Sequence, residues 1–258
     1  MKAVILAGGF GTRIAEESDT KPKPMVEIGN RPLLWHIMKI YSHYGVNDFI
    51  ICLGYKGYVI KEYFVNYQNH TSDININLTT GKTKILNSHA ENWNVTLIDT
   101  GIETMTGGRL KRISPYLDNE TFFMTYGDGL SDIDINAELE FHKASKKMVT
   151  IGAVQPPGRF GALEINQDNI VTSFKEKPKD EIGWINGGFF ILEPQAIDYI
   201  GDDLTSWESE PLKNISKDSQ LAAFKHFGFW MPCDTLRDKR QLQKMWENHE
   251  APWKVWNN

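Results

Sequence analysis

Short, continuous apolar segments alternate with segments of helical periodicity along the chain, and this alternation restricts the fold more than any other feature of the sequence. We expect the apolar segments to be strands: Ala3–Leu6, Asp48–Leu53, Thr121–Tyr126, Met148–Val154 and Phe189–Leu192. Apolar runs without alternation are typical of strands that are buried on both faces of a mostly parallel sheet. The sequence therefore predicts an α/β fold in which helices flank a mostly parallel, mixed sheet.

The remaining elements are predicted from periodicity and turn residues. Helices are expected over residues 33–44, 59–67, 135–145, 195–200, 207–218 and 236–248. Two stretches instead alternate apolar and polar residues, Asp73–Leu86 around Thr-Gly-Lys and Gly161–Lys175 around Asp168-Asn169, and each predicts an added β-hairpin. We expect a single domain over residues 1–258, with an inserted hairpin region near residues 70–100 and a C-terminal helical segment near residues 236–258.

Charge and cysteine content exclude several classes of partner. The chain has 258 residues and a net charge of −5, so neither nucleic acid nor an anionic membrane is an expected partner. No apolar stretch approaches the length of a membrane span. Cys52 and Cys233 lie far apart and form no Cys-x-x-Cys motif, which argues against disulfides and a zinc site. A soluble protein of the reducing cytoplasm is the expectation.

The first strand runs into a glycine-rich turn, Gly8-Gly9-Phe10-Gly11-Thr12-Arg13. The spacing fits neither the dinucleotide fingerprint G-x-G-x-x-G nor the P-loop G-x-x-x-x-G-K-[ST], and a plain structural turn is one alternative. However, glycines let backbone N–H groups approach a ligand, and Arg13 can bind phosphate oxygens in a bidentate manner. Lys23 follows between two prolines that stiffen the backbone. Together these residues predict a polyphosphate site at the carboxyl end of the first strand.

These motifs resemble the sugar-1-phosphate nucleotidylyltransferases, in particular those that transfer a cytidylyl group. The resemblance rests on GGFGTR followed by KPKPM and runs almost end to end through WNVTLIDTG, TGGRLKRI, FMTYGDGLSDID, PPGRFGAL, EKP, INGGFF and DTLRDK. It implies a Rossmann-like nucleotide-diphospho-sugar transferase fold, a requirement for Mg²⁺, and CTP and α-D-glucose 1-phosphate as substrates. The implied product is CDP-glucose, a precursor for dideoxyhexoses and the O-antigen of lipopolysaccharide. Such chemistry requires alignment and charge neutralisation but no protein nucleophile.

The resemblance also implies the roles of individual residues. Arg13, Lys23, Asp128 and Lys177 are expected to be catalytic, and Asp128 and Asp234 to bind Mg²⁺. From the residues alone, Asp128 in Tyr-Gly-Asp-Gly fits a turn as well, and Asp234 fits an ordinary helix N-cap. The expected nucleotide-binding residues are Leu6, Ala7, Gly8, Gly9, Phe10, Gly11, Thr12, Arg13, Lys23, Thr104, Gly108, Arg109 and Asp128. Glu176, Lys177, Asn186 and Gly187 are expected to bind the sugar, Lys177 through its phosphate.

Several alternatives and secondary expectations remain. The same reaction with UTP or dTTP, or a catalytically silent sugar-nucleotide-binding protein, fits the same motifs. A homo-oligomer, a hexamer by resemblance, is expected, and the hairpin at residues 73–86 is a candidate contact. We interpret Trp246, Trp253 and Trp256 as core or subunit-contact anchors and Cys233 as a packing residue. The polar stretch 14–22 is a candidate flap that brings Lys23 to the phosphates.

Overall fold

A sheet of seven strands forms the centre of the computed structural model, which describes residues 1–11, 21–156, 162–165, 171–175 and 183–256. The strands are β1 (Ala3–Leu6), β4 (Asp48–Leu53), β7 (Asn94–Asp99), β8 (Phe122–Tyr126), β10 (Val149–Val154), β13 (Ile185–Leu192) and β14 (Leu221–His226). Their order is β14-β10-β13-β8-β1-β4-β7. Within this sheet β13 alone runs antiparallel to its neighbours, β8 and β10, and the remaining pairings are parallel.

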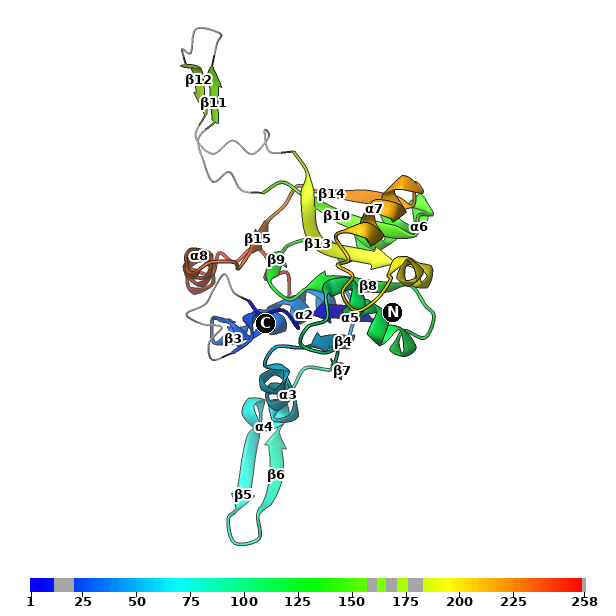
Figure 1. The fold of residues 1–258 in the computed structure, drawn as a ribbon. Helices are drawn as coiled ribbons and strands as arrows, with labels where there is room; N and C mark the ends of the chain where they lie inside the picture. Colours follow the sequence, from blue (N-terminus) through cyan, green and yellow to red (C-terminus); the bar gives the residue numbers. More distant parts are fainter. Residues whose placement is uncertain (12–20, 157–161, 166–170, 176–182, 257–258) are drawn as a thin grey trace.

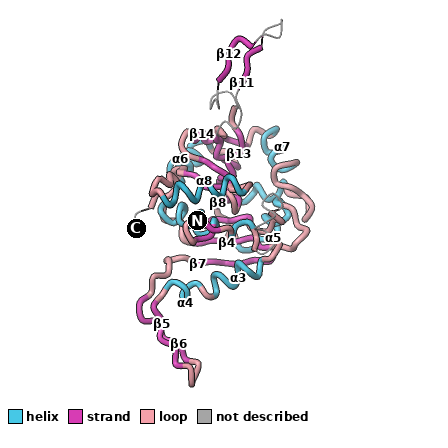
Figure 2. The backbone as a smooth tube through the Cα atoms, turned by 90° about the vertical axis from the view of Figure 1, so that its left-hand side faces the viewer, coloured by secondary structure: helices cyan, strands magenta, loops and turns pink. Residues whose placement is uncertain are grey.

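Helices cover both faces of this sheet. They are α2 (Leu33–His43), α3 (Gly57–Val65), α4 (Tyr67–Thr71), α5 (Thr106–Ile113), α6 (Ile135–Ser145), α7 (Glu210–Lys217) and α8 (Leu236–Glu247), with 3-10 helices η2 (Lys23–Met25), η3 (Ser114–Tyr116) and η4 (Pro194–Tyr199). Figure 2 shows α6 on one side of the sheet and α5 and α7 on the other. This arrangement buries both faces of the strands, as their continuous apolar sequences require.

Each face of the sheet has its own hydrophobic cluster. Ala3 and Ile5 of β1 pack with α2, α8 and the C-terminal tryptophans, whereas Val4 and Leu6 pack with α5, η4 and α7. Trp253 is completely buried, and its ring stacks against that of Trp246 at 6.3 Å between centroids. The interpretation of these tryptophans as core anchors is therefore confirmed for this chain.

In the described part of the chain, four small ladders lie outside the main sheet. β2 (Glu27–Ile28) pairs with β3 (Arg31–Pro32), β5 (Asp73–Asn77) with β6 (Lys82–Asn87), β9 (Gly129–Ser131) with β15 (Trp230–Pro232), and β11 (Ala162–Ile165) with β12 (Val171–Lys175). Figure 1 shows the β5–β6 hairpin extending from the body of the molecule beyond α3 and α4. Both predicted hairpins are thus confirmed, although the predicted turn at Asp168-Asn169 lies outside the described residues.

The predicted fold class is confirmed, with corrections to individual elements. The predicted helix over residues 59–67 is wrong in its bounds, because α3 ends at Val65 and α4 begins at Tyr67. Asn186-Gly187-Gly188 was expected to precede a strand but lies within β13, where a Cβ on Gly187 would lie 2.7 Å from the Val154 side chain and one on Gly188 2.6 Å from the Tyr126 ring. Strand β14 was not predicted, because its sequence LAAFKH mixes polar and apolar residues, as a half-buried edge strand does. The single-domain division stays a prediction.

Among the described residues, no helix has both the length and the apolar character that crossing a membrane requires.

Candidate active site

Strand direction brings the predicted site residues to one edge of the sheet. Leu6 lies beside Cys52 of β4 and Tyr126 of β8, so the turn after β1 and the Gly127-Asp128 segment emerge side by side. Because β13 is antiparallel, its amino end lies at this same edge. Asn186, near the start of β13, therefore lies close to Tyr126 at the end of β8.

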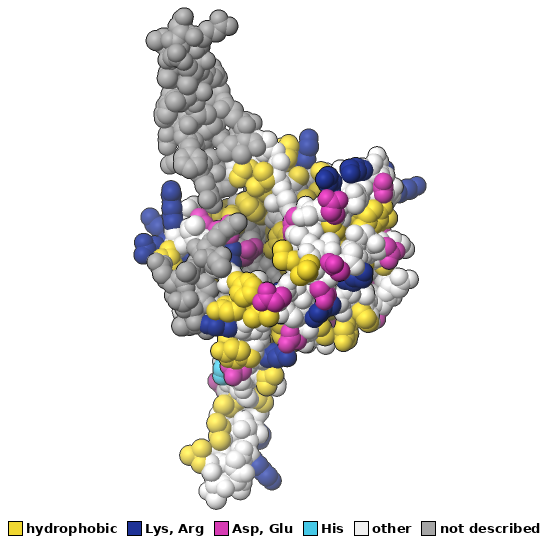
Figure 3. Space-filling view, in the orientation of Figure 1, with side chains coloured by type: hydrophobic (Ala, Val, Ile, Leu, Met, Phe, Trp, Pro, Cys, Tyr) yellow, Lys and Arg dark blue, Asp and Glu magenta, His cyan; other side chains and the backbone are white. Residues whose placement is uncertain are grey.

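A cavity of about 460 Å³ opens at this edge. It is lined by the turn after β1 (residues 6–11), the Lys23-Pro24 pair, residues 102–106 with Arg109, the Tyr126–Asp128 segment and Asp234. Figure 3 shows a hollow in the middle of this face with hydrophobic and acidic side chains at its margin. Three of the lining side chains, Phe10, Ile102 and Met105, are about half exposed. An apolar margin of this kind suits a flat aromatic ring such as a nucleobase.

Arg109 is hydrogen-bonded to the glycine turn. Its side chain is buried, and its guanidinium donates hydrogen bonds to the carbonyl oxygens of Gly8 (3.0 Å), Leu53 (3.0 Å) and Gly101 (2.8 Å). It also donates to Thr100 Oγ1 at 2.7 Å. Burial lowers the pKa of this guanidinium, but the acceptors around it keep the charged form well solvated. Arg109 therefore lines the cavity and also joins the glycine turn to the ends of β4 and β7.

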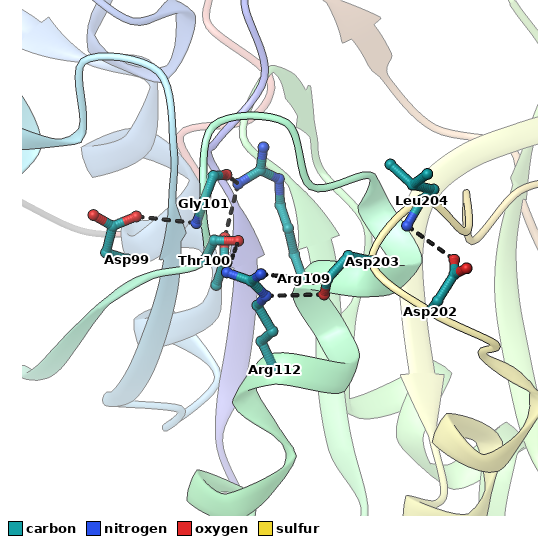
Figure 4. A network of polar contacts seen from close by, with 8 residues as sticks. All are labelled: Asp99, Thr100, Gly101, Arg109, Arg112, Asp202, Asp203 and Leu204. Atoms are coloured by element: carbon teal, nitrogen blue, oxygen red, sulfur yellow. Dashed lines mark hydrogen bonds and ion pairs between the residues drawn. The ribbon is translucent and has the colours of Figure 1, made fainter.

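The helix that carries Arg109 is itself braced. Arg112, one turn further along α5, binds both carboxylate oxygens of Asp203, with Nε–Oδ1 at 2.9 Å and Nη2–Oδ2 at 2.6 Å (Figure 4). Met105 N donates to Asp203 O at 2.8 Å. The glycine pair at the start of α5 permits this contact, because a Cβ on Gly108 would lie 2.5 Å from Asp203 O. Gly108 thus packs against the backbone and is not among the residues that line the cavity.

Lys23 lies between the two carboxylates that the sequence singled out. Its Nζ is 2.6 Å from Asp128 Oδ2 and 2.5 Å from Asp234 Oδ1. The β9–β15 ladder brings the carboxylates together, since Cys233 N donates to Asp128 O at 2.8 Å. Asp234 is not the N-cap of α8, because Thr235 caps that helix. The N-cap alternative for Asp234 is therefore wrong.

Burial alone would lower the pKa of Lys23, but the charges and hydrogen bonds of Asp128 and Asp234 outweigh this and raise it. The ammonium group is consequently charged at neutral pH. No group of three or more potential metal-ligating residues occurs in the described part of the chain. Two converging carboxylates nevertheless fit Mg²⁺, which takes few protein ligands and completes its shell with water and substrate phosphates.

The sugar residues predicted from the sequence lie partly within the described structure. Asn186 Nδ2 donates to Tyr126 Oη at 3.4 Å, and Asn186 Oδ1 accepts from Gly188 N at 2.7 Å. Gly187 is buried, and its carbonyl accepts from Trp230 Nε1 at 2.6 Å. Thr12, Arg13, Glu176 and Lys177, as well as most of the proposed flap, lie outside the described residues.

Sequence reasoning missed some of the residues at this site. Tyr126, Thr106 and Pro24 line the cavity but were not predicted as ligand contacts. Tyr126 stands directly before Gly127-Asp128 at the end of a strand, a position that would have pointed to it.

Cys233, next to Asp234, is buried, and burial raises the pKa of its thiol to about 12. The thiol is therefore not a nucleophile at neutral pH, in keeping with the packing role inferred for it.

A glycine turn, a lysine and two carboxylates thus meet at the carboxyl edge of the sheet, where α/β folds usually bind ligands, and comparison with known proteins identifies the class of protein. The family model for nucleotidyl transferases matches residues 2–230. The chain belongs to this family.

Particular relatives narrow the class further. The chain is 58% identical to a glucose-1-phosphate cytidylyltransferase of Salmonella typhi over 99% of this chain and 100% of that protein. It is 43% identical to a probable glucose-1-phosphate cytidylyltransferase of Bacillus subtilis, with the same coverage. Among solved structures, HddC of Yersinia pseudotuberculosis complexed with GMP-PN aligns with a TM-score of 0.68 and 26% identity, over 95% of this chain and 99% of that one.

Proposed function

We propose that the protein transfers the cytidylyl group of CTP to α-D-glucose 1-phosphate and releases CDP-glucose and pyrophosphate. The proposal is supported by full-length similarity to glucose-1-phosphate cytidylyltransferases. The observation that carries it is the position of Lys23, held between Asp128 and Asp234 at the edge of a cavity that the glycine turn lines.

In the proposed reaction a phosphate oxygen of the sugar phosphate attacks the α-phosphorus of CTP in line with the departing pyrophosphate. Asp128 and Asp234 would hold Mg²⁺, which when bound supplies positive charge to the phosphates. Lys23 and Arg13 would neutralise charge on the triphosphate, and Lys177 would bind the sugar phosphate. The remaining residues of the turn, Leu6 to Thr12, with Thr104 and Arg109, would contact the nucleotide. Gly108 would contribute through the close packing of α5 against Asp203. Glu176, Asn186 and Gly187 would bind glucose hydroxyls.

Lys23 has a particular part in this scheme because it occupies the point on which both carboxylates converge. A cation there and the lysine ammonium group repel each other. We therefore infer that Lys23 moves from the carboxylates to the phosphates when nucleotide and metal bind, with the 14–22 stretch as its flap. Equal placement of this stretch with and without CTP would contradict the flap.

The decisive experiment is a panel of CTP, UTP, dTTP, ATP and GTP with glucose 1-phosphate, assayed by pyrophosphate release. We expect CTP to exceed the others in kcat/KM, and a wide margin for UTP or dTTP would favour the alternative substrates. Asp128→Asn and Lys23→Ala should retain the fold and lose on the order of 100-fold in kcat, because each removes charge at the transferring phosphate. Tight binding of CDP-glucose without any turnover would instead favour a silent sugar-nucleotide-binding protein.

The protein is further proposed to act in the cytoplasm as a homo-oligomer, a hexamer by resemblance, without nucleic-acid or membrane partners. Its product would enter dideoxyhexose and O-antigen synthesis. The β5–β6 hairpin is the proposed subunit contact, because it carries exposed apolar side chains, Ile76, Leu78 and Leu86, away from the body of the molecule (Figure 3). Sedimentation of the protein with and without Leu78→Asp tests this contact.

A further inference from the structure

Glu208 lies outside the cavity, yet its carboxylate is the acceptor for two hydroxyl groups that line it. Tyr126 Oη donates to Glu208 Oε1 at 2.5 Å, and Thr106 Oγ1 donates to Glu208 Oε2 at 2.7 Å. Ser206 Oγ also donates to Oε2, at 2.6 Å. Glu208 is exposed as a residue, but its carboxylate is turned toward these three hydroxyls. The Glu208 side chain thus holds two residues that line the cavity, Tyr126 and Thr106, by hydrogen bonds from outside it.

The carboxylate determines where each of these protons points. An ionised carboxylate can only accept hydrogen bonds, so each of the three hydroxyls must donate to it. Although the residue as a whole is exposed, partial burial of its carboxylate opposes ionisation of Glu208. The hydrogen bonds from Ser206, Thr106 and Tyr126 outweigh this and lower its pKa, so the group is ionised at neutral pH. Tyr126 Oη is therefore the donor of its 2.5 Å contact, and its proton points at Glu208.

The direction of the Tyr126 proton also orients Asn186. Because the phenol has no second proton, its oxygen can only accept from Asn186, so the atom that faces it is the amide nitrogen. The amide oxygen is then free to accept from Gly188 N, as the 2.7 Å contact requires. This leaves Asn186 with a second N–H and Tyr126 with acceptor capacity beside the cavity. A donor next to an acceptor matches a hydroxyl group, which accepts and donates at once.

We propose that Glu208 is a positioning residue of the sugar site, which acts through Tyr126 to present Asn186 as a donor and the phenol oxygen as an acceptor to one hydroxyl of the sugar. The inference rests on the proposed function, since it takes the occupant of this part of the site to be a sugar phosphate. Because the hydroxyl protons of Tyr126 and Thr106 are donated to Glu208, both oxygens can only accept hydrogen bonds from a ligand. This part of the cavity consequently binds hydroxyl or amino groups in preference to phosphate oxygens.

The informative variant is Glu208→Gln, which keeps the shape and replaces one acceptor oxygen by a donor. Thr106 and Ser206 share Oε2, so the amide oxygen is best placed there and the NH₂ faces Tyr126. The phenol must then turn its proton away from residue 208, toward Asn186. Glu210→Gln is the matched control, because Glu210 lies on the same segment and, among the described residues, its side chain forms an exposed ion pair with Lys213.

Kinetics with sugar analogues separate this role from a merely structural one. We expect Glu208→Gln and Tyr126→Phe to raise KM for glucose 1-phosphate about 10-fold, a typical effect of one mispaired hydrogen bond, while KM for CTP changes less than about twofold. With the deoxyglucose 1-phosphate that lacks the hydroxyl in question, wild type and variants should become equal. Glu210→Gln should match wild type throughout. The proposal would be overturned if the variants lost activity relative to wild type equally with every deoxyglucose 1-phosphate. It would also be overturned if the KM values for glucose 1-phosphate and for CTP rose equally.

Unfolding in urea tests the network without any substrate. If Glu208 acts through Tyr126, the double variant Tyr126→Phe/Glu208→Gln should unfold at the same urea midpoint as the less stable single variant, whereas additive shifts in the midpoint would refute the coupling. If the wild-type protein does not turn over CTP and glucose 1-phosphate and the midpoints are still non-additive, the proposed function fails and the hydrogen-bond network stands. If it does turn them over and the midpoints are additive, the proposed function stands and the coupling through Tyr126 fails.

Discussion

Replacing Gly8 by alanine tests whether the first glycine of the turn serves the protein or the ligand. A Cβ on Gly8 would overlap Nη1 and Cζ of Arg109 and lie 2.8 Å from Nε. Flexible side chains usually move aside from such an overlap, but Arg109 is 4% exposed and fixed by four hydrogen bonds of 3.0 Å or less. Gly9 is the matched control, because a Cβ there would meet no atom within 4 Å.

The cost follows from the bonds that Arg109 loses when it is displaced. Hydrogen bonds to a charged group contribute about 1.5–3 kcal/mol each, and displacement that disrupts one or two of them costs about 3 kcal/mol. For a chain of this size, such a loss lowers Tm by about 6–12 °C. Gly9→Ala should leave Tm within about 2 °C of wild type, since it neither overlaps an atom nor requires a positive φ.

Differential scanning calorimetry of both variants, with urea unfolding as a second probe, measures these differences. The affinity of each variant for CTP, measured by isothermal titration calorimetry, shows whether the glycine also contributes to ligand binding. A Gly8→Ala protein with the wild-type Tm would show that Arg109 is not fixed as the structure describes. Equal destabilisation by Gly8→Ala and Gly9→Ala would assign both glycines to the turn itself and refute the special role of Gly8.

Two further predictions concern buried titratable groups. Glu138 is completely buried and makes no hydrogen bond to a described residue, and burial raises its pKa to about 8. Between pH 4.5 and 8 the folded state therefore keeps a proton that the unfolded state loses, and the free energy of unfolding should fall with pH by up to about 1.4 kcal/mol per unit. Glu138→Gln should become progressively more stable than wild type over this range in urea titrations. A difference in the free energy of unfolding between the two proteins that does not change with pH would disprove the assignment. Cys52 and Cys233 are both buried with thiol pKa values of about 12, so a thiol reagent at pH 8 should label neither in the native protein and both in urea, whereas rapid native labelling would contradict their burial.

The elements that the sequence predicts well are those whose local pattern and burial agree. Asp48–Leu53 and Ile135–Ser145 have the predicted bounds in the structure, because a continuous apolar run and a capped amphipathic segment are each defined by their own residues. Asp134 caps the latter helix, because its side chain accepts from Ala137 N. Strands β9 and β15 are only three residues long and exist through pairing with each other, so no local pattern predicts them.

The same distinction separates the site residues. Motif resemblance selects Lys23, Asp128 and Asp234, and the structure brings all three together. It also selects Arg109. The hydrogen bonds that Arg109 donates to backbone carbonyls depend on three loops, and no sequence pattern places these loops beside it. Glu208 has no motif at all, since its relevance comes from the direction of a phenol that lies 82 residues earlier. Contacts of this kind are set by tertiary packing and emerge only from coordinates.

The reversed direction of β13 explains how one edge of the sheet can serve two substrates. In a fully parallel sheet, the beginning of every strand lies at the edge opposite to the ligand site. Since β13 runs antiparallel to β8, Phe189 pairs with Thr125, and the residues that begin β13 approach those that end β8. Asn186 thereby reaches Tyr126, while the glycine turn after β1 lies on the other side of β8. Strand β8, with Asp128 directly after it, thus lies between the glycine turn and Asn186. In the proposed reaction the α-phosphorus, at which the nucleotide and the sugar phosphate meet, would therefore lie next to that carboxylate.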